Sequence, residues 1–297
     1  MHLGIDIGGT KTDAVVVDAE GRVRARRRLP SGKGGEAVVA AAVESARLAC
    51  ADVDANPADL SVGIGSPGTV VDGVVSHAVN LGVERMNLAA EFAAVWGVVP
   101  RIDNDVNAAA LGAWTLAGRE ASSMAYLNLG TGLAAGIVLD GRVWRGSRGA
   151  AGEIGHISVD PAGPVGADGL PGGLETYASG SGLVLQWGVE GATGRDVVAA
   201  AEAGDARARA ICDRAFFGLA SSVRVLVLTL DVEQVVVGGG MTAWGPALVD
   251  GAAALLDSWA ATSPFLASLD LPGRMSLLES DVPVAAVGAA MLGGGHG

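Results

Sequence analysis

The sequence is poor in cysteine and in positive charge, and both shortages narrow what the protein can be. Two cysteines, Cys50 and Cys212, are too few for a disulfide framework. Each lies in a helical pattern, so we expect both to be reduced core residues. A net charge of −12 does not suit nucleic acid or an anionic membrane, which need basic patches. The one basic cluster, at 22–28, is short and interrupted and fits an exposed strand. We therefore expect neither nucleic acid nor membrane as a partner.

Long apolar runs and leader segments are also missing. No run of apolar residues is long enough to span a bilayer. Met1 leads directly into a predicted strand, which leaves no room for a signal peptide, so we expect a cytoplasmic protein. The 297 residues, half of them hydrophobic, can bury a large core and allow about two domains. With 46 glycines and 18% charged residues, the chain should be compact and rich in turns.

A turn between a strand and a helix holds the main candidate for catalysis. Residues 96–102 predict an apolar strand, and residues 106–117 predict a packed helix rich in strong helix formers. Asp103, Asn104 and Asp105 lie between them, where one can cap the free amides of the first turn while another points outward. A plain N-cap with an acidic first turn remains the alternative.

Two hairpins with glycine and threonine at the turn suggest phosphate binding. Gly8-Gly9-Thr10 joins strands at 2–7 and 13–18, and Gly130-Thr131-Gly132 joins strands at 123–129 and 133–139. Such glycines let backbone amides and a hydroxyl approach an anion, although a purely structural turn is the alternative for the first hairpin taken alone. The first is not a Walker A loop, because the glycine spacing differs and no helix follows. The repeat predicts two similar domains, each giving one hairpin to the cleft between them.

Three further segments are candidates for ligand binding. Gly152-Glu153-Ile154-Gly155-His156 places a carboxylate and an imidazole among glycines, where they can fork towards one small polar ligand. A loop held by its own hydrogen bonds is the alternative. A strand at 234–237 ends in Gly238-Gly239-Gly240, which can form a floor for a base or a ribose, or a tight turn. Asn80 lies in a loop and would by itself only satisfy local backbone. Helices are predicted at 34–52, 88–96, 196–203, 206–228 and 283–292.

Together these segments resemble the ROK family (repressor, open reading frame, kinase) of sugar kinases and sugar-responsive regulators, from Ile5 to about Leu292. The resemblance implies an α/β, two-domain fold of the actin and hexokinase type (ribonuclease H-like), an ATPase fold with the active site in the interdomain cleft. We expect one domain at 1–115, joined by the C-terminal helix at 281–297, and another at 116–280. The motifs that carry the resemblance are Asp6-Ile-Gly-Gly-Thr-Lys11, Gly65-Ser-Pro-Gly68, Asn104-Asp105 with Asn107-Ala-Ala-Ala110, Leu129-Gly-Thr-Gly132, Gly152-Glu-Ile-Gly-His156, Leu174-Glu175 and Val237-Gly-Gly-Gly-Met241.

The resemblance also implies a role for each matching residue. Asp105 would be the catalytic base that accepts the proton of the attacking sugar hydroxyl, and Asp6 would lie near magnesium. A homodimer is expected. The sugar would be bound by Gly68, Asn80, Asn104, Asp105, Glu153, His156 and Glu175, and ATP by Gly8, Gly9, Thr10, Lys11, Thr131, Gly132, Gly239 and Gly240.

One part of the family pattern is missing. Many members follow the histidine of Gly-Glu-x-Gly-His with a zinc-binding segment, Cys-x-Cys-Gly-x-x-Gly-Cys-x-Glu. Here the same register reads Gly166-Ala-Asp168-Gly-Leu-Pro-Gly-Gly173-Leu-Glu175, so all three thiolates are absent. Structural zinc sites normally take four ligands from Cys and His. We therefore expect no structural zinc, with ATP and Mg²⁺ as the cofactors.

The sequence thus predicts an ATP-dependent sugar kinase that phosphorylates a hexose, in the first place glucose at O6. A kinase for N-acetylmannosamine, N-acetylglucosamine or fructose, with ATP or polyphosphate as donor, is the alternative within the family. A sugar-sensing regulator is the alternative from another class. It would need a helix-turn-helix before the first strand, for which Met1 leaves no space, and Asp105 also argues against it.

Overall fold

The computed structural model describes residues 1–279 and 281–295 and divides into two compact units. Unit 1 contains residues 1–122, 136–149 and the described residues from 282 onward, and unit 2 contains residues 123–135 and 150–281 without 280. Residues 116–122 and 136–149, which we expected in the second domain, therefore group with unit 1. Two parts of the predicted boundaries, residue 280 and residues 296–297, lie outside the described residues.

A five-stranded sheet forms the centre of unit 1, in the order β3-β2-β1-β4-β8. β4 runs parallel to β1, and β8 runs parallel to β4, so the carboxyl ends of these three strands meet at one edge. The register pairs Asp6 with Gly65, and Gly65 with Asp103. This edge therefore brings three predicted motifs together. The strands are β1 (His2–Ile7), β2 (Lys11–Val17), β3 (Val23–Pro30), β4 (Ser61–Ser66) and β8 (Arg101–Asn104).

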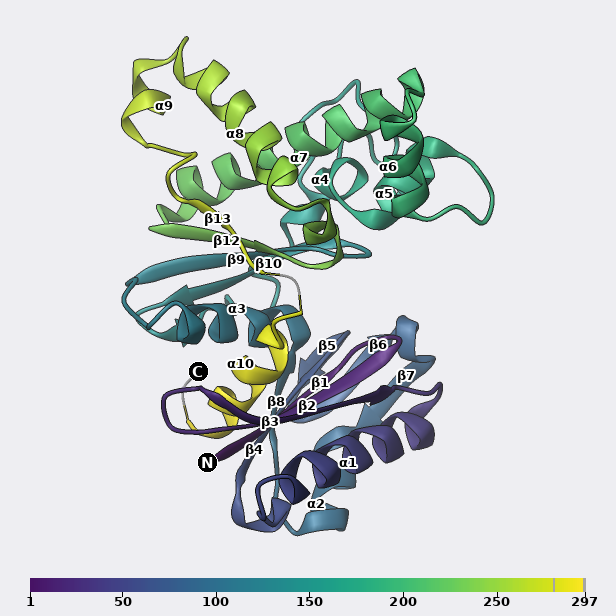
Figure 1. The fold of residues 1–297 in the computed structure, drawn as a ribbon, viewed down its shortest axis with the longest axis vertical. Helices are drawn as coiled ribbons and strands as arrows, with labels where there is room; N and C mark the ends of the chain where they lie inside the picture. The colour runs from purple at the N-terminus through teal and green to yellow at the C-terminus, as the bar shows by residue number, and fades with distance from the viewer. Residues whose placement is uncertain (280, 296–297) are drawn as a thin grey trace. The chain divides into compact units, whose positions relative to one another are not determined.

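Helices cover both faces of this sheet (Figure 1). α1 (Gly35–Ala51) buries one apolar stripe against Leu3, Ile5 and Ile7. α3 (Asp105–Leu116) and α10 (Val284–Gly293) pack on the opposite face, where alternate residues of β2 point. The backbone of α10 lies unusually close to β4, because a Cβ on Gly63 would lie 1.8 Å from the backbone oxygen of Ala289. The glycines of this region thus set how near α10 comes to the sheet.

A smaller sheet and a short helix complete unit 1, and here one prediction is wrong. α2 (Leu88–Trp96) ends at Gly97, which has φ 70° and closes the helix in the left-handed conformation. Residues 97–100 are not strand, and β8 starts only at Arg101. The apolar residues before Pro100 misled the strand prediction, whereas Gly97 was the informative signal. The small sheet contains β5 (Thr69–Val71), β6 (Val74–Ala78) and β7 (Val83–Asn87), with 3-10 turns η1 (Pro57–Asp59) and η2 (Val79–Leu81) nearby in sequence.

The second five-stranded sheet has the order β11-β10-β9-β12-β13, and β9, β12 and β13 run parallel. Its strands are β9 (Ser123–Leu129), β10 (Leu133–Leu139), β11 (Arg142–Val143), β12 (Gln234–Gly238) and β13 (Met275–Leu277). The helical elements of unit 2 are η3 (Ile154–His156), α4 (Leu174–Tyr177), α5 (Gly180–Trp187), α6 (Gly194–Glu202), α7 (Ala206–Leu230), η4 (Gly240–Trp244), α8 (Pro246–Ala260) and α9 (Pro264–Ser268).

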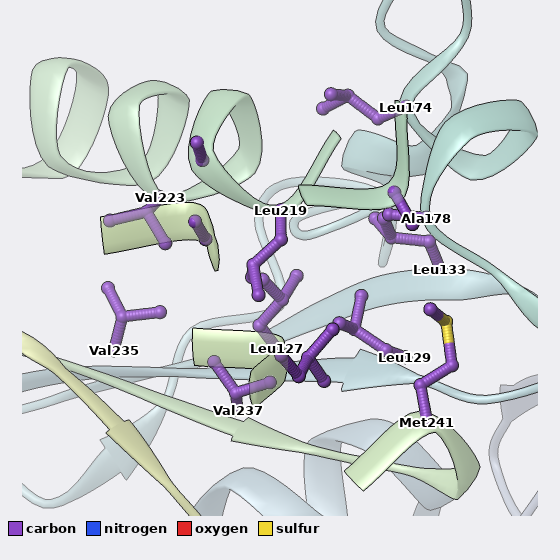
Figure 2. Packing of buried hydrophobic residues seen from close by; sticks show 14 of the residues in the cluster. Leu127, Leu129, Leu133, Leu174, Ala178, Leu219, Val223, Val235, Val237 and Met241 are labelled. Carbon is purple, nitrogen blue, oxygen red and sulfur yellow. The ribbon is translucent and has the colours of Figure 1, made fainter. Parts of the chain in front are cut away.

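The core of unit 2 lies between β9, β12 and the long helix α7 (Figure 2). Leu127 and Val237 meet Leu219 from α7, and all three side chains are fully buried. The helix predicted at 206–228 is confirmed as α7, but it is not buried on all sides, and its first turn is largely exposed. Cys212 in α7 and Cys50 in α1 are both buried and free, as we expected of core cysteines.

Candidate active site

The first glycine hairpin is the turn between β1 and β2. Gly8 N donates to Lys11 O at 3.0 Å, which closes the turn. Ser31 also fixes the turn, because its Oγ donates to Gly8 O at 2.6 Å and its amide donates to Thr10 O at 3.2 Å. Thr10 and Lys11 are exposed. The turn is therefore rigid and presents a hydroxyl and an ammonium group to solvent, as an anion site requires.

The same hairpin lies against the loop that carries Asn80. A Cβ on Gly9 would lie 3.0 Å from Cβ of Asn80, so the two backbones are in close contact. Asn80 is exposed in η2, and Lys33 Nζ donates to its backbone oxygen. The amide side chain of Asn80 is thereby placed beside the turn that contains Gly8 and Gly9.

The turn between β8 and α3 separates the two roles that the sequence left open. Asn104 is the N-cap, because its Oδ1 accepts from the amides of Val106 at 2.9 Å and Asn107 at 3.4 Å. Its Nδ2 donates to Gly68 O at 3.3 Å, which connects the cap to the β4–β5 turn. Asp105 is the first residue of α3 and is half-buried. Asn104 is therefore the N-cap residue, and Asp105, which is not, also accepts from Val106 N at 3.0 Å through its Oδ1.

Asp6 lies near Asp105, across Gly65. A Cβ on Gly65 would lie 3.5 Å from Cα of Asp105 and 3.9 Å from Oδ1 of Asp6. Desolvation by burial, with the negative charges of Asp105 and Asp13, raises the pKa of Asp6 to about 8, and Arg28 opposes this shift. Carboxylates that repel each other in this way fit a hard cation such as Mg²⁺, which takes oxygen ligands.

A magnesium ion here would depend on few protein ligands. Within residues 1–279 and 281–295, no cluster of three or more His, Cys, Asp or Glu side chains could hold a metal ion. Mg²⁺ usually keeps several waters and is bound through one or two carboxylates plus substrate phosphates. The donor set around Asp6 therefore suits a nucleotide-bound magnesium better than a dedicated metal site.

Sequence reasoning gave Asp103 no role of its own beyond its place among the three turn residues, and the structure places it in β8, just before the turn. Asp103 is only 5% exposed, and its carboxylate accepts from Arg145 Nε at 2.8 Å, from Asn104 N at 2.7 Å and from Asn107 Nδ2 at 2.9 Å. These bonds hold the residues on both sides of Asp105 in place. An aspartate at the end of a buried strand needs a cation, and that need was the only sequence signal, because Arg145 lies far along the chain.

The second glycine hairpin is the turn between β9 and β10 in unit 2, and it is fixed by the start of α5. Gly180 N donates to Gly130 O at 2.8 Å, and Ser181 donates to Thr131 O from its amide at 3.0 Å and from its hydroxyl at 2.7 Å. Thr131 is exposed at the tip of the turn. This hairpin thus resembles the first: hydrogen-bond donors from another segment bind its backbone carbonyls, and a threonine is exposed at the turn.

A pocket of about 760 Å³ opens beside this hairpin. Its lining includes Thr131, Glu175, Arg195, Gly240 and Trp244. Gly239, with φ 87°, forms part of the adjacent turn, where a Cβ would lie 2.6 Å from the backbone of Leu129. The volume lies within the range of pockets that bind cofactors and other small molecules.

Glu175 connects this pocket with the Gly-Glu-x-Gly-His segment. Its Oε2 accepts from Leu133 N at 2.9 Å, and a Cβ on Gly132 would lie 2.5 Å from the same oxygen. Gly155 packs on the other side, since a Cβ there would lie 3.2 Å from Cβ of Glu175. Unit 2 therefore brings Gly132, Glu175 and the η3 turn together.

The loop from η3 to α4 is also held by its own hydrogen bonds, as the alternative reading proposed. Tyr177 Oη donates to Asp160 Oδ2 at 2.9 Å, and Val159 N donates to Gly172 O at 2.9 Å. The side chains of Glu153 and His156 nevertheless remain exposed. The loop thus has an ordered backbone and leaves a carboxylate and an imidazole available to a ligand.

Comparison with known proteins gives a consistent family. The model of the ROK family matches residues 2–292. A glucokinase from Halalkalibacterium halodurans is 32% identical over 272 residues, which cover 84% of this chain and 82% of that protein. An N-acetylmannosamine kinase from Escherichia coli is 31% identical over 274 residues, 91% of each chain. The solved structure of a ROK family glucokinase from Streptomyces griseus, in complex with glucose and AMPPNP, is similar with a TM-score of 0.73 and 29% identity over 98% of each chain.

These matches confirm the resemblance seen in the sequence and the predicted fold class, the two-domain α/β fold of the actin and hexokinase type. The glucokinase and the N-acetylmannosamine kinase named above, which share at least 30% of their residues with this chain, are sugar kinases. No helix within the described residues is both long and apolar enough to cross a membrane. On the extent of the family match, the chain is a member of the ROK family.

Proposed function

We propose that the protein is an ATP-dependent kinase that phosphorylates glucose at O6. The observation that carries this proposal is the half-buried Asp105, at the first position of α3 and not its N-cap, close to Asp6 and next to a glycine hairpin with exposed Thr10 and Lys11. A base, a place for magnesium and a phosphate-binding turn are the parts that phosphoryl transfer from ATP requires. Membership in a family that contains sugar kinases supports this function.

Asp105 accepts the proton of the attacking hydroxyl, and Asn104, Gly68 and Asn80 orient the sugar from unit 1. Glu153, His156 and Glu175 of unit 2 pair with further hydroxyls. A sugar presents several groups that both donate and accept, so carboxylates, an amide and an imidazole can pair them and penalise a misplaced isomer. The carboxylate base contributes a modest part of the rate, since positioning and charge neutralisation dominate phosphoryl transfer.

The phosphates of the nucleotide are bound by residues of the two glycine hairpins: Gly8, Gly9, Thr10 and Lys11 in the first, and Thr131 and Gly132 in the second. Gly239 and Gly240 lie beside the adenosine, in keeping with the place of Gly240 in the wall of the 760 Å³ pocket. Magnesium, when bound near Asp6 with the nucleotide, neutralises charge on the transferred group.

A second candidate acceptor is N-acetylmannosamine. The observation that favours it is the 31% identity with an N-acetylmannosamine kinase over 91% of both chains, an extent similar to the match with the glucokinase. The substituent at C2 would be read by the loops that carry Asn80 and Glu153. N-acetylglucosamine and fructose belong to the same alternative, and polyphosphate is an alternative donor.

A panel of hexoses and amino sugars in a coupled assay of ADP release tests the acceptor. We expect kcat/KM to be highest for glucose, and product analysis to show phosphate on O6. A parallel series with polyphosphate in place of ATP tests the donor. If N-acetylmannosamine were the best acceptor, the second candidate would replace the first. If no sugar increased ADP release above the rate without acceptor, the kinase proposal would be wrong. Light scattering on the same sample tests the homodimer that we also propose.

A further inference from the structure

We propose that Asp168 is a positioning residue that fixes the tautomer of His156, so that Nε2 of this histidine accepts a hydrogen bond from a sugar hydroxyl. The inference rests on the proposed function, in which His156 binds the sugar. It starts from one contact: Nδ1 of His156 lies 3.5 Å from Oδ2 of Asp168. The tautomer decides whether the ring gives or receives a hydrogen bond at Nε2.

Asp168 is well placed to act on the ring. Its Oδ1 accepts from Leu170 N at 3.0 Å, within a tight hairpin that Gly166 N closes by donating to Leu170 O at 2.8 Å. The Leu170 amide, followed by the interaction with His156, lowers the pKa of Asp168 below its usual value. Asp168 is therefore ionised at neutral pH. One oxygen is used by the hairpin, and the other faces the ring.

His156 is held at the opposite side of this contact. It ends η3, in which Ile157 N donates to Ile154 O at 2.9 Å, and the preceding Gly155 packs against Glu175. An ionised carboxylate can only accept hydrogen bonds, so a neutral ring beside Asp168 carries its proton on Nδ1. Nε2 then has a free lone pair. Within the described part of the chain it has no hydrogen-bond partner, which leaves it to a ligand.

The contact is suited to orientation and contributes little to stability. The side chains of His156 and Asp168 are 66% and 38% exposed, and exposed pairs of this kind contribute little to folding. A distance of 3.5 Å is long for a hydrogen bond, and such contacts often shorten when the substrate binds. The expected effect of Asp168 is therefore on sugar binding, through the orientation of the ring and through which ring nitrogen carries the proton.

The variant Asp168→Asn separates this role from a purely structural one. An asparagine has one accepting and one donating end. If its Oδ1 keeps the bond from Leu170 N, its NH₂ group faces Nδ1 and donates to it, which moves the ring proton to Nε2. The hairpin stays intact, but the ring now offers a donor where it offered an acceptor. We expect the KM for the sugar to rise about tenfold, the scale of one mispaired polar group, with kcat and the KM for ATP nearly unchanged.

The chain offers a matched control. His77 and Glu84 form another exposed pair, with Nδ1 3.1 Å from Oε1, and both residues belong to unit 1, outside the proposed site. Glu84→Gln makes the same chemical change there and should leave both KM values unchanged. Asp168→Ala, which frees the ring without reversing it, should raise the sugar KM by less than Asp168→Asn does.

Nitrogen-15 NMR of labelled histidine reads the tautomer directly and does not depend on activity. At pH 8, where an ordinary histidine is neutral, we expect the Nδ1–H form for His156 in the native protein and the Nε2–H form in Asp168→Asn. His156→Ala identifies the resonance. An Nε2–H ring in the native protein, or the same tautomer and sugar KM in both proteins, would overturn the assignment of Asp168. A native protein that phosphorylates no sugar would instead reject the proposed function, while the NMR result would still decide on the tautomer.

Discussion

Asp105 follows immediately after Asn104, the residue that caps α3. Asn104 provides the cap, and an asparagine at 105 can keep the bond that Asp105 Oδ1 accepts from Val106 N at 3.0 Å. Replacement of Asp105 by asparagine should therefore leave the helix start intact. We predict that Asp105→Asn lowers kcat by about 10² to 10⁴-fold, the scale of a lost general base, with little change in sugar affinity or melting temperature. Steady-state kinetics and calorimetry of the purified variant measure both. Asp250→Asn, at an exposed position of α8, is the control. Near-normal turnover in Asp105→Asn would show that Asp105 is not the base.

Asp6 gives a second prediction at the scale of one residue. Its pKa is raised to about 8 in the folded chain, mainly by desolvation. Between the ordinary aspartate pKa and pH 8, the unfolded chain loses this proton while the folded chain keeps it. The folded state without metal therefore loses stability as pH rises through this window. The variant Asp6→Asn has no ionisable group at this position, so this loss of stability with rising pH does not occur in it.

We therefore predict that Asp6→Asn gains stability relative to the native protein between pH 5 and pH 8, by at least about 1 kcal/mol, the equivalent of one pKa unit. Urea unfolding of both proteins at the two pH values, without nucleotide or Mg²⁺, gives the difference. Equal pH dependence in the two proteins would mean that the pKa of Asp6 is not raised. Magnesium and ATP should improve the stability of the native protein more than that of the variant, because the ion needs the carboxylate.

At the scale of elements, α10 is held by close backbone packing. A Cβ on Gly288 would lie 1.7 Å from the backbone oxygen of Ala108 in α3. We predict that Gly288→Ala destabilises the protein by about 1 to 3 kcal/mol, the usual cost of overpacking, because backbone must move to admit the methyl group. Gly35→Ala is the control, since a Cβ there would meet only the flexible Met86 Sδ at 3.3 Å. Chemical unfolding should show a loss in the first variant and none in the second.

The elements were predictable where periodicity and caps agreed. The helix at 34–52 and the final helix at 283–292 correspond closely to α1 and α10, because their apolar positions recur at helical spacing. The strand at 96–102 was half wrong, because an apolar run without alternation does not reveal where a helix stops. The ion pair of Asp103 with Arg145 could not be predicted at all, since no local pattern connects two residues on separate elements.

At the scale of the whole molecule, the order of the motifs along the chain was the strongest signal for the family and fold. Each motif alone was compatible with a plain turn or cap. Only the order of all the motifs along the chain argued against this purely structural interpretation. The division into units was harder to predict. Residues 136–149 belong to unit 1, although they follow β9 in the sequence, because Gly136 packs against Val106 and Ala110 of α3. Contacts of this kind join residues far apart in the chain, and no periodic pattern in the sequence reveals them.

The last prediction concerns metal in the whole protein: as purified, it should contain no stoichiometric zinc. Structural zinc takes four ligands from Cys and His, and can contribute on the order of 10 kcal/mol to a small domain. The loop between His156 and Glu175 contains no cysteine, and Asp168 stands in the register of one of the cysteines of the family pattern. Backbone hydrogen bonds and the Tyr177–Asp160 bond order this loop instead.

Elemental analysis and a strong chelator test this prediction. We expect far less than one zinc per chain, and a melting temperature that does not change when the chelator is added. The variant Tyr177→Phe lacks the hydrogen bond to Asp160, which helps to order this loop. We expect it to destabilise the protein by about 1 kcal/mol, the net contribution of one hydrogen bond. About one zinc per chain, lost together with activity in His156→Ala, would mean that ligands outside this loop complete a metal site.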